Sequence, residues 1–244
     1  MSKKKTKLKT FKHSGDLGDI IFSLPTIKTM GGGTLYLDPK GGESLEGMPM
    51  PAAGKTKLNS ESIENMKTLL ELQPYITEVK EWDGESIDVD LDTFRKHIEY
   101  NNLAYSHLEA QEITHTKADA EWLELGDNTF ELPEDRTVVI SRNLRYQGNH
   151  SFWEMNAPNL SEEAVFVGSP YEHEVFQKVF GIEIPYVETS TALDLMKVID
   201  ASKMFISNQG LPHAIAEGLK KRLICEVDKT YPAACWRRED ATYV

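Results

Sequence analysis

A short polar segment near the N-terminus carries two aspartates and two glycines in front of an apolar run. It reads His13-Ser-Gly-Asp-Leu-Gly-Asp19. Gly15 and Gly18 allow a ligand to approach the backbone closely. Asp16 and Asp19 stand at a predicted helix start, where aspartate is a favoured cap. An aspartate in such a loop can also act as a general base, so the segment indicates either capping or catalysis.

A second polar turn lies near the C-terminus, between an apolar strand pattern and an apolar helix pattern. Residues 203–220 read KMFISNQGLPHAIAEGLK. Pro212 suits a first helical turn, because its missing N–H would have no partner there. The N–H groups at a helix start attract phosphate. We therefore predict that Asn208, Gln209 and Gly210 hold an anionic ligand.

A loop with two arginines and a tyrosine follows another predicted strand. Residues 141–148 read SRNLRYQG. The guanidinium groups of Arg142 and Arg145 can pair with phosphate oxygens, and the ring of Tyr146 can pack on a base or a sugar. Surface arginines in salt bridges are the alternative interpretation.

Three other patterns resemble motifs of different chemistry but depart from them. Gly54-Lys55-Thr56 lacks the earlier glycine of a phosphate-binding loop, since Pro49 stands at that position. Asp88-Val-Asp-Leu-Asp92 contains the metal-binding pattern Asp-x-Asp, but its alternation favours a half-buried strand with a wet acidic face. Three histidines in the same region lack metal-ligand spacing: His97, His107 and His115. We expect no metal and no resident cofactor.

The composition limits the kind of partner. The chain has 244 residues and a formal net charge of −12, which disfavours general binding to nucleic acid or anionic membranes but permits a local basic groove. Two cysteines provide neither a disulfide framework nor a metal quartet, which favours a reducing cytoplasm. No apolar run approaches the roughly 20 residues that span a bilayer, and the lysine-rich start lacks the apolar stretch of a signal peptide.

The elements that must position these residues form two α/β halves. Gly126–Asp135 is polar and rich in turn residues, so we predict domains at 1–128 and 129–244. Strands and helices alternate in the second domain, which predicts a parallel sheet with ligand loops at the carboxyl ends of its strands. The first domain is predicted to be a less regular α/β unit with a long helical stretch over residues 94–125.

These blocks together resemble the heptosyltransferase-like GT-B glycosyltransferases, and most closely the compact members encoded by tailed bacteriophages. The resemblance rests on Gly18-Asp-x-x-x-x-Leu-Pro25, on the strand end Val165–Ser169, and on the block Leu193–Leu219. It implies two facing Rossmann-like domains with a cleft between them, an acceptor on the N-terminal side and a nucleotide-sugar donor on the C-terminal side. Asn208-Gln209-Gly210 replaces the usual Asp-x-Gly turn.

The resemblance also implies metal-independent, inverting transfer of a sugar to an acceptor hydroxyl. Asp19 occupies the family's position for the base that deprotonates the acceptor, and Asp16 lies beside it. The predicted donor-binding residues are Gly15, Gly18, Arg142, Arg145, Tyr146, Gly168, Ser169, Glu172, Asn208, Gln209, Gly210, His213 and Glu217. For Glu217, an exposed helix position is an equal alternative to a contact with ribose.

The sequence leaves two candidates for the acceptor. It is either a saccharide or, given the phage-like features, a hydroxymethylated pyrimidine in DNA, for which Lys96, His97 and His107 would line a local basic groove. A non-catalytic protein that binds nucleotides or nucleotide-sugars, and an epimerase of GT-B architecture, are the alternative functions.

Overall fold

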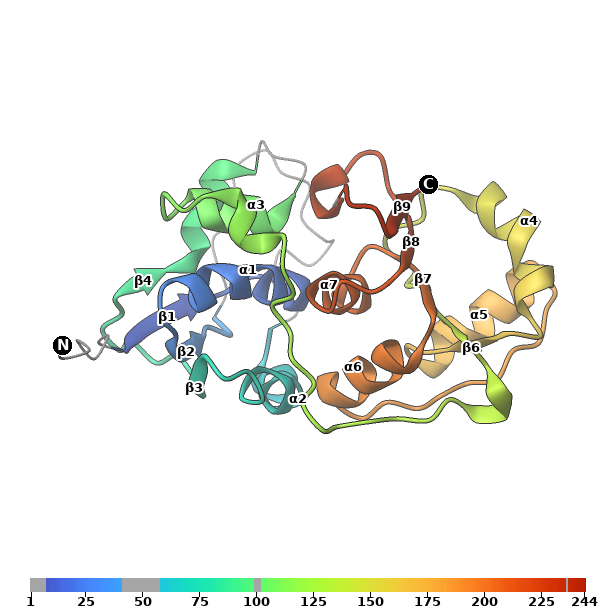
Figure 1. Cartoon of the computed structure of the whole chain (residues 1–244), viewed down its shortest axis with the longest axis horizontal. Coiled ribbons are helices and arrows are strands. Elements are labelled where there is room, and N and C mark those ends of the chain that lie inside the picture. The colour runs from blue at the N-terminus through green and yellow to red at the C-terminus, as the bar shows by residue number, and fades with distance from the viewer. Residues whose placement is uncertain (1–7, 41–57, 99–101, 236) are drawn as a thin grey trace. The chain divides into compact units, whose positions relative to one another are not determined.

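The computed structural model describes residues 8–40, 58–98, 102–235 and 237–244. The chain divides into two compact units, Met1–Trp122 and Leu123–Val244, each of which combines strands with helices (Figure 1). The predicted domain boundary lies slightly further along the chain. The segment Gly54–Thr56, whose sequence departs from that of a phosphate-binding loop, lies outside the described residues.

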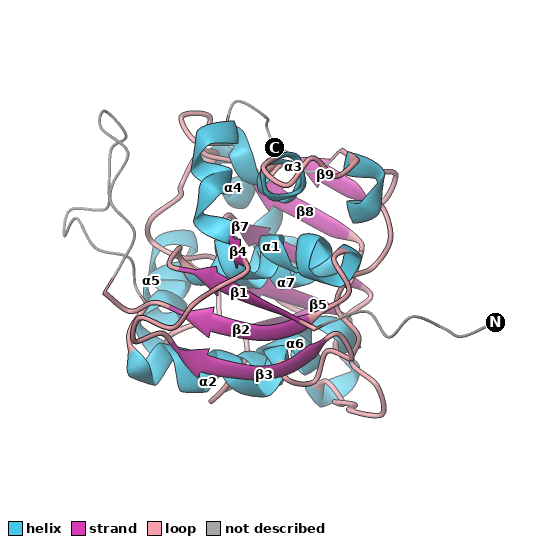
Figure 2. Cartoon of the chain, turned by 90° about the vertical axis from the view of Figure 1, so that its left-hand side faces the viewer, coloured by secondary structure: helices cyan, strands magenta, loops and turns pink. Residues whose placement is uncertain are grey.

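A four-stranded parallel sheet with the strand order β3-β2-β1-β4 forms the centre of the N-terminal unit. Its strands are β1 (Lys9–His13), β2 (Gly33–Leu37), β3 (Ile76–Glu81) and β4 (Val89–Asp90). Its helical segments are α1 (Leu17–Thr29), α2 (Ser60–Leu70), η1 (Leu91–His97), α3 (Leu103–Glu109) and η2 (His115–Ala118). Helix α1 packs against α3, and α2 packs against β3. Figure 2 shows β1, β2 and β3 side by side.

The C-terminal unit contains a five-stranded parallel sheet with the order β6-β5-β7-β8-β9. Its strands are β5 (Val138–Ser141), β6 (Ala164–Phe166), β7 (Met204–Asn208), β8 (Leu223–Glu226) and β9 (Ala241–Tyr243). Its helices are α4 (His150–Leu160), α5 (Pro170–Phe180), α6 (Ala192–Ala201) and α7 (Leu211–Gly218), with short turns η3 (Pro133–Asp135) and η4 (Pro232–Ala234). The predicted α/β class with parallel sheets is confirmed in both units.

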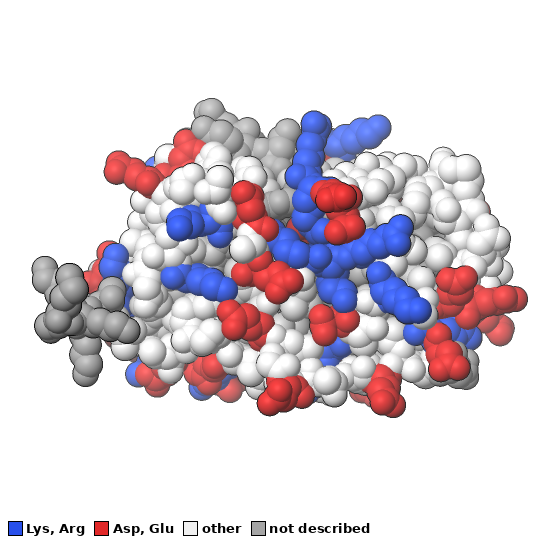
Figure 3. Space-filling model, in the orientation of Figure 1, with Lys and Arg blue, Asp and Glu red and all other residues white. Residues whose placement is uncertain are grey.

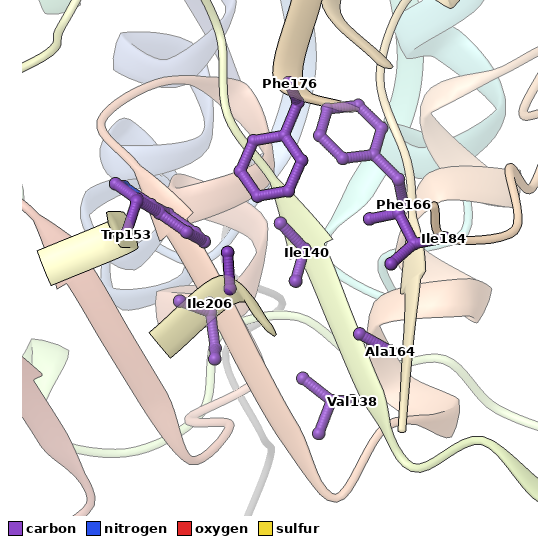
Figure 4. Packing of buried hydrophobic residues seen from close by; sticks show 9 residues of the cluster. Val138, Ile140, Trp153, Ala164, Phe166, Phe176, Ile184 and Ile206 are labelled. Carbon is purple, nitrogen blue, oxygen red and sulfur yellow. The ribbon is translucent and has the colours of Figure 1, made fainter. Parts of the chain in front are cut away.

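The apolar core of the C-terminal unit explains why these strands and helices hold together. Alternate strand residues Val138, Ile140 and Phe166 are buried on one face of the sheet, as the two-residue period of a strand requires. Trp153 of α4 and Phe176 of α5 pack on that face with their rings 5.1 Å apart and nearly perpendicular (Figure 4). Helix α4 packs against α5, and α6 packs against α7.

One local prediction is wrong. The long helix over residues 94–125 is divided into η1, α3 and η2. The side-chain oxygen of Asn102 accepts hydrogen bonds from the N–H groups of Ala104 and Tyr105, which starts a new helix at this point instead of continuing one. Further along the chain, Tyr186 extends the sheet beside β6 by an isolated bridge to Phe166.

The buried ring of Phe176 is expected to contribute strongly to stability. Replacing it with alanine (Phe176→Ala) should lower the free energy of unfolding by about 3–5 kcal/mol, because a cavity remains in a packed core. Chemical denaturation of the full chain measures this loss. Val179→Ala on the same helix is the matched control, since Val179 is 48% exposed and should lose less than about 0.5 kcal/mol. Equal losses in the two variants would contradict the described packing.

Candidate functional site

Each sheet has one point at which the strand order reverses, and polar loops flank it. In the N-terminal unit, β2 and β4 lie on opposite sides of β1, and in the C-terminal unit, β6 and β7 lie on opposite sides of β5. Because the strands are parallel, the loops that follow them leave the same edge of their sheet. Ligands of open parallel sheets bind at such reversal points. The loops after β1 and β4, and those after β5 and β7, are therefore candidate sites within their own units.

The loop after β1 and the first turn of α1 carry the two predicted catalytic aspartates. Asp16 caps α1, and Asp19 stands three positions later in a capping box, with its Oδ2 accepting a hydrogen bond from the N–H of Asp16 at 3.3 Å. The loop is tight, since a side chain on Gly15 would approach His13 Cε1 to 2.5 Å and Asp19 Oδ2 to 2.9 Å. Gly18 lies in the first turn of the helix. The capping interpretation of these aspartates is confirmed.

Asp92 holds this loop from the first turn of η1, directly after the neighbouring strand β4. Its carboxylate accepts hydrogen bonds from the N–H and hydroxyl of Ser14 (3.0 and 2.7 Å) and ion pairs with Lys12 (3.1 Å) and Arg95 (2.6 Å). Burial alone would raise the pKa of Asp92, but the His13 ring, Arg95 and the Ser14 bond outweigh it and hold the pKa below its usual range. The predicted wet acidic face is wrong for this residue, which is an ionised anchor of the loop.

Two histidine rings meet beneath the same loop. The Nε2 atoms of His13 and His107 lie 3.0 Å apart, and both side chains are buried. Burial lowers the pKa of His13 to about 4 despite the nearby Asp92. Burial, together with His13, lowers the pKa of His107 well below its ordinary value. The prediction that His107 lines a basic surface groove is therefore wrong, because its ring is enclosed and disfavours charge.

In the C-terminal unit, two consecutive amide side chains hold the loops beside β7. Asn208 accepts a hydrogen bond from the N–H of Asn143 (2.9 Å) and donates to the carbonyl of Tyr146 (2.6 Å). Gln209 accepts from the N–H of Asp228 (2.7 Å) and donates to the carbonyl of Tyr231. These amides thus fix the loops after β5 and β8, a role that the helix-start motif did not indicate.

Among the described residues, no side-chain hydrogen bond caps the start of α7, which follows these amides. Gly210 precedes α7 with φ of 153°, and a side chain there would approach Asn143 Nδ2 to 2.9 Å. The first N–H groups of a helix have no partner within it and carry a partial positive charge. Together with Leu211, Gly210 therefore supplies anion-binding geometry at the reversal point beside β5.

The side chain of Arg142 is buried within the C-terminal unit and paired with a carboxylate there. Its guanidinium makes a bidentate salt bridge with Glu226 at 2.8 and 3.1 Å, and both side chains are buried. The Glu226 carboxylate also accepts hydrogen bonds from the N–H of Asn149 (2.8 Å) and from Trp153 Nε1 (2.7 Å). A buried carboxylate requires such partners. Arg142 therefore ties β5 to β8 and α4.

Arg145 and Tyr146 have a different environment. The Arg145 guanidinium carbon lies 4.6 Å from the centre of the Tyr146 ring, which suits a cation–π contact. The ring of Tyr231 meets the Tyr146 ring edge-on, with 6.0 Å between the ring centres. Arg145 is exposed. It lies, together with the two tyrosines, in loops at the same edge of the sheet as Gly210.

The remaining predicted donor residues are mostly engaged in local structure. Ser169 and Glu172 form the capping box of α5, next to Gly168, whose carbonyl accepts a hydrogen bond from Tyr186. His213 is buried and its Nε2 donates to the carbonyl of Ala234 (2.8 Å). Glu217 is buried too, and its carboxylate binds Arg238 (3.1 Å) and Tyr243 (2.6 Å). The exposed position considered for Glu217 is wrong, because its oxygens link α7 to the C-terminal segment.

Three residues of this framework were not singled out from the sequence as site residues: Asp92, Glu226 and Tyr231. Two of them have a recognisable signal. Glu226 is a charged residue that ends an otherwise apolar strand pattern, and Arg142 ends another, so a buried pair at the strand ends is foreseeable. Asp92 likewise is a charged residue that directly follows a short apolar pattern, Val89-Asp-Leu91. Tyr231 has no such signal, because its place depends on Gln209.

Some features are missing from the described parts of the chain. Within residues 8–40, 58–98, 102–235 and 237–244, no cluster of three or more His, Cys, Asp or Glu side chains has metal-binding geometry. Over the same ranges, no helix combines the length and apolar character that crossing a bilayer requires. Figure 3 shows Lys and Arg side chains interspersed with Asp and Glu on one face.

The fold of GT-B glycosyltransferases consists of two α/β units, each with a parallel sheet and with ligand-binding loops at the carboxyl ends of its strands. No family model and no curated protein matches the sequence. Solved structures do match. The chain is similar to a family 9 glycosyl transferase from Veillonella parvula, with a TM-score of 0.64 and 11% identity over 99% of this chain and 87% of that one.

Two heptosyltransferases from Escherichia coli are also similar. WaaC, solved with ADP-2-deoxy-2-fluoro heptose, has a TM-score of 0.56 and 10% identity over 96% of this chain and 92% of that one. TibC, described as dodecameric and iron-containing and solved with ADP-D-beta-D-heptose, has a TM-score of 0.58 and 11% identity over 97% of this chain and 63% of that one. The chain therefore has the fold of heptosyltransferase-like glycosyltransferases.

The buried histidine pair should make stability depend on pH. An unfolded histidine binds a proton near pH 6.5, whereas folded His13 does so only near pH 4, so the unfolded state binds more protons between these values. The stability contribution of the neutral ring is complete above about pH 6.5 and is lost as the pH falls to about 4, by on the order of 3 kcal/mol. Chemical denaturation at several pH values measures the slope.

Variants separate this effect from the titration of carboxylates. His107→Gln removes one of the two buried rings and should flatten the slope between pH 6.5 and 4. His150→Gln is the control, since the His150 side chain is 53% exposed, and it should follow the wild type. Parallel curves for the wild type and His107→Gln would contradict the assignment.

Proposed function

We propose that the protein is a glycosyltransferase that moves a sugar from a nucleotide-sugar to an acceptor hydroxyl. The observation that carries the proposal is the arrangement of the C-terminal unit. There, the loops after β5 and β7 and the start of α7 flank the reversal point of the sheet, in a chain that shares its fold with known glycosyltransferases. We assign the donor to this unit.

The start of α7 and Arg145 are our candidates for the diphosphate. Cleaving the anomeric bond leaves charge on the departing phosphate, which fixed donors stabilise better than bulk water does. The N–H groups of Gly210 and Leu211 are such donors, and each is worth roughly 2.7–4 kcal/mol of barrier. Arg145 adds a charge from an exposed loop. We assign Arg142, Asn208 and Gln209 to holding these loops, since their side chains bond to protein groups.

The chemical class of the donor follows from the related structures and from the tyrosines. WaaC has been solved with ADP-2-deoxy-2-fluoro heptose and TibC with ADP-D-beta-D-heptose, which supports an ADP-linked sugar as the first candidate donor. Tyr146 and Tyr231 offer aromatic surface close to the proposed diphosphate site, and such surface suits a nucleobase.

Asp19 is the proposed base. Its carboxylate takes the proton of the acceptor hydroxyl while the acceptor oxygen bonds to the anomeric carbon. The bond from that carbon to the phosphate oxygen breaks, and its electron pair leaves with the nucleoside diphosphate. A single displacement of this kind inverts the anomeric centre and needs no metal. Asp16, as the cap of α1, orients the helix start from which Asp19 projects.

For the acceptor we propose a saccharide in preference to hydroxymethylated DNA of phage origin. The net charge of −12 opposes binding to a polyanion, and the burial of His107 removes one residue of the groove that DNA would require. We place the reaction in the cytoplasm, where the free thiols of Cys225 and Cys235 stay reduced.

A thermal-shift screen tests the donor assignment. The probes are ADP, UDP, GDP and CMP together with their common sugar conjugates, including ADP-heptose. A ligand at a hundred times its Kd should stabilise the fold by about 2.7 kcal/mol, and we expect the largest shift with the ADP series. The absence of any shift would remove the basis for a nucleotide-sugar site.

Asp19→Asn tests the catalytic assignment. The amide keeps the shape and the capping oxygen but cannot accept a proton, so kcat should fall by about 100-fold or more while the thermal shift with the donor nucleotide is retained. Asp83→Asn, at a side chain that is 85% exposed, is the control and should keep full turnover. Unchanged turnover in Asp19→Asn would rule out the base, and no turnover in the wild type would favour a pure binder.

A further inference from the structure

The hydrogen bonds of the histidine pair beneath the loop after β1 determine which ring nitrogens carry protons. The Nδ1 of His107 lies 2.7 Å from the carbonyl of Leu103, which only accepts, so Nδ1 carries a proton. The Nδ1 of His13 accepts a hydrogen bond from the N–H of Gly15 at 2.8 Å, so it carries none. With both rings neutral, the His13 Nε2 proton is donated to His107 Nε2 across 3.0 Å. One directed chain of hydrogen bonds therefore runs from Gly15 to α3.

Packing holds the acceptor ring of this chain in place. The ring of Phe94 stacks on His107, with 4.0 Å between the ring centres and 13° between the planes. The groups that face the pair are Lys12 from β1 and Asp92 and Arg95 from η1, which bond to one another around the same loop. His107 thus has a fixed position from which it orients His13.

The other end of the chain reaches the proposed catalytic loop. Gly15 has no room for a side chain between His13 and Asp19, so we infer that a shift of its backbone would disturb the side chain of Asp19. Asp92 fixes the preceding residue, Ser14, through the backbone N–H and the hydroxyl. The loop is held at two consecutive residues, by Asp92 at Ser14 and by the buried ring of His13 at Gly15.

We propose that His107 is a positioning residue for catalysis, acting through His13 and Gly15 on the carboxylate of Asp19. The proposal rests on the proposed function, in which Asp19 is the base. Loss of the His107 acceptor leaves the His13 Nε2–H buried without a partner, which is costly. The His13 ring then turns or changes tautomer, and Gly15 loses its acceptor.

The test separates turnover from donor binding. His107→Leu should lower kcat by about 10- to 100-fold, since misplacing a catalytic group by about 1 Å has effects of this size. The donor KM and the thermal shift with ADP should stay unchanged. His107→Gln, whose side-chain oxygen can accept a hydrogen bond from His13 Nε2–H, should restore most of kcat. His115→Leu, on η2 of the same unit, is the matched control and should keep wild-type kinetics.

Several results would overturn the proposal. A wild-type kcat in His107→Leu would do so while leaving the glycosyltransferase function intact. Equal losses of kcat and of donor binding in that variant would also overturn it. So would a kcat in His107→Gln as low as that in His107→Leu. A wild-type protein that binds nucleotides but transfers no sugar would remove the proposed function and the positioning role together.

A spectroscopic measurement on the wild type applies even if His107→Leu does not fold. Nitrogen-15 NMR of the imidazole rings at pH 7 should report a proton on Nε2 of His13 and on Nδ1 of His107. The opposite pattern, or a doubly protonated ring, would overturn the proposal.

Discussion

Parallel strand pairing is the constraint on which the candidate site depends. In each unit all strands run in one direction, so every loop that follows a strand leaves from the same edge of its sheet. The loop that leads to Asp19 therefore lies beside the segment that carries Asp92, although the two are far apart in sequence. The same geometry brings the loop of Arg145 next to the start of α7.

Buried polar side chains convert this rough proximity into defined positions. Glu226 binds Arg142, Asn149 and Trp153, while Asn208 and Gln209 bind the backbone of two different loops. In the N-terminal unit Asp92 and the histidine pair do the same for the loop after β1. A buried charge or amide without partners is costly, so these contacts determine how the loops run over the edge of each sheet.

The sequence was informative where its signal is local. Apolar runs predicted β5 and β7, and the turn residues predicted the loops that follow β1 and β7, because strand formation and chain reversal depend on neighbouring residues. The partners of the polar side chains could not be predicted. His13 and His107 are 94 residues apart, and Arg142 and Glu226 are 84 apart. No local pattern encodes such a pair, so His107 was read as a surface residue and Arg142 as a phosphate ligand.

The anchoring of Asn208 and Gln209 also bears on the thermodynamics of ligand binding. Flexible loops that close over a ligand lose conformational entropy at that step, which weakens affinity. Here the loops after β5 and β8 are already tied to the end of β7 through the carbonyls of Tyr146 and Tyr231, so most of that entropy is lost when the protein folds. Under the proposed function, a nucleotide that enters between these loops would meet a surface with its final shape, and its association should approach that of a rigid body.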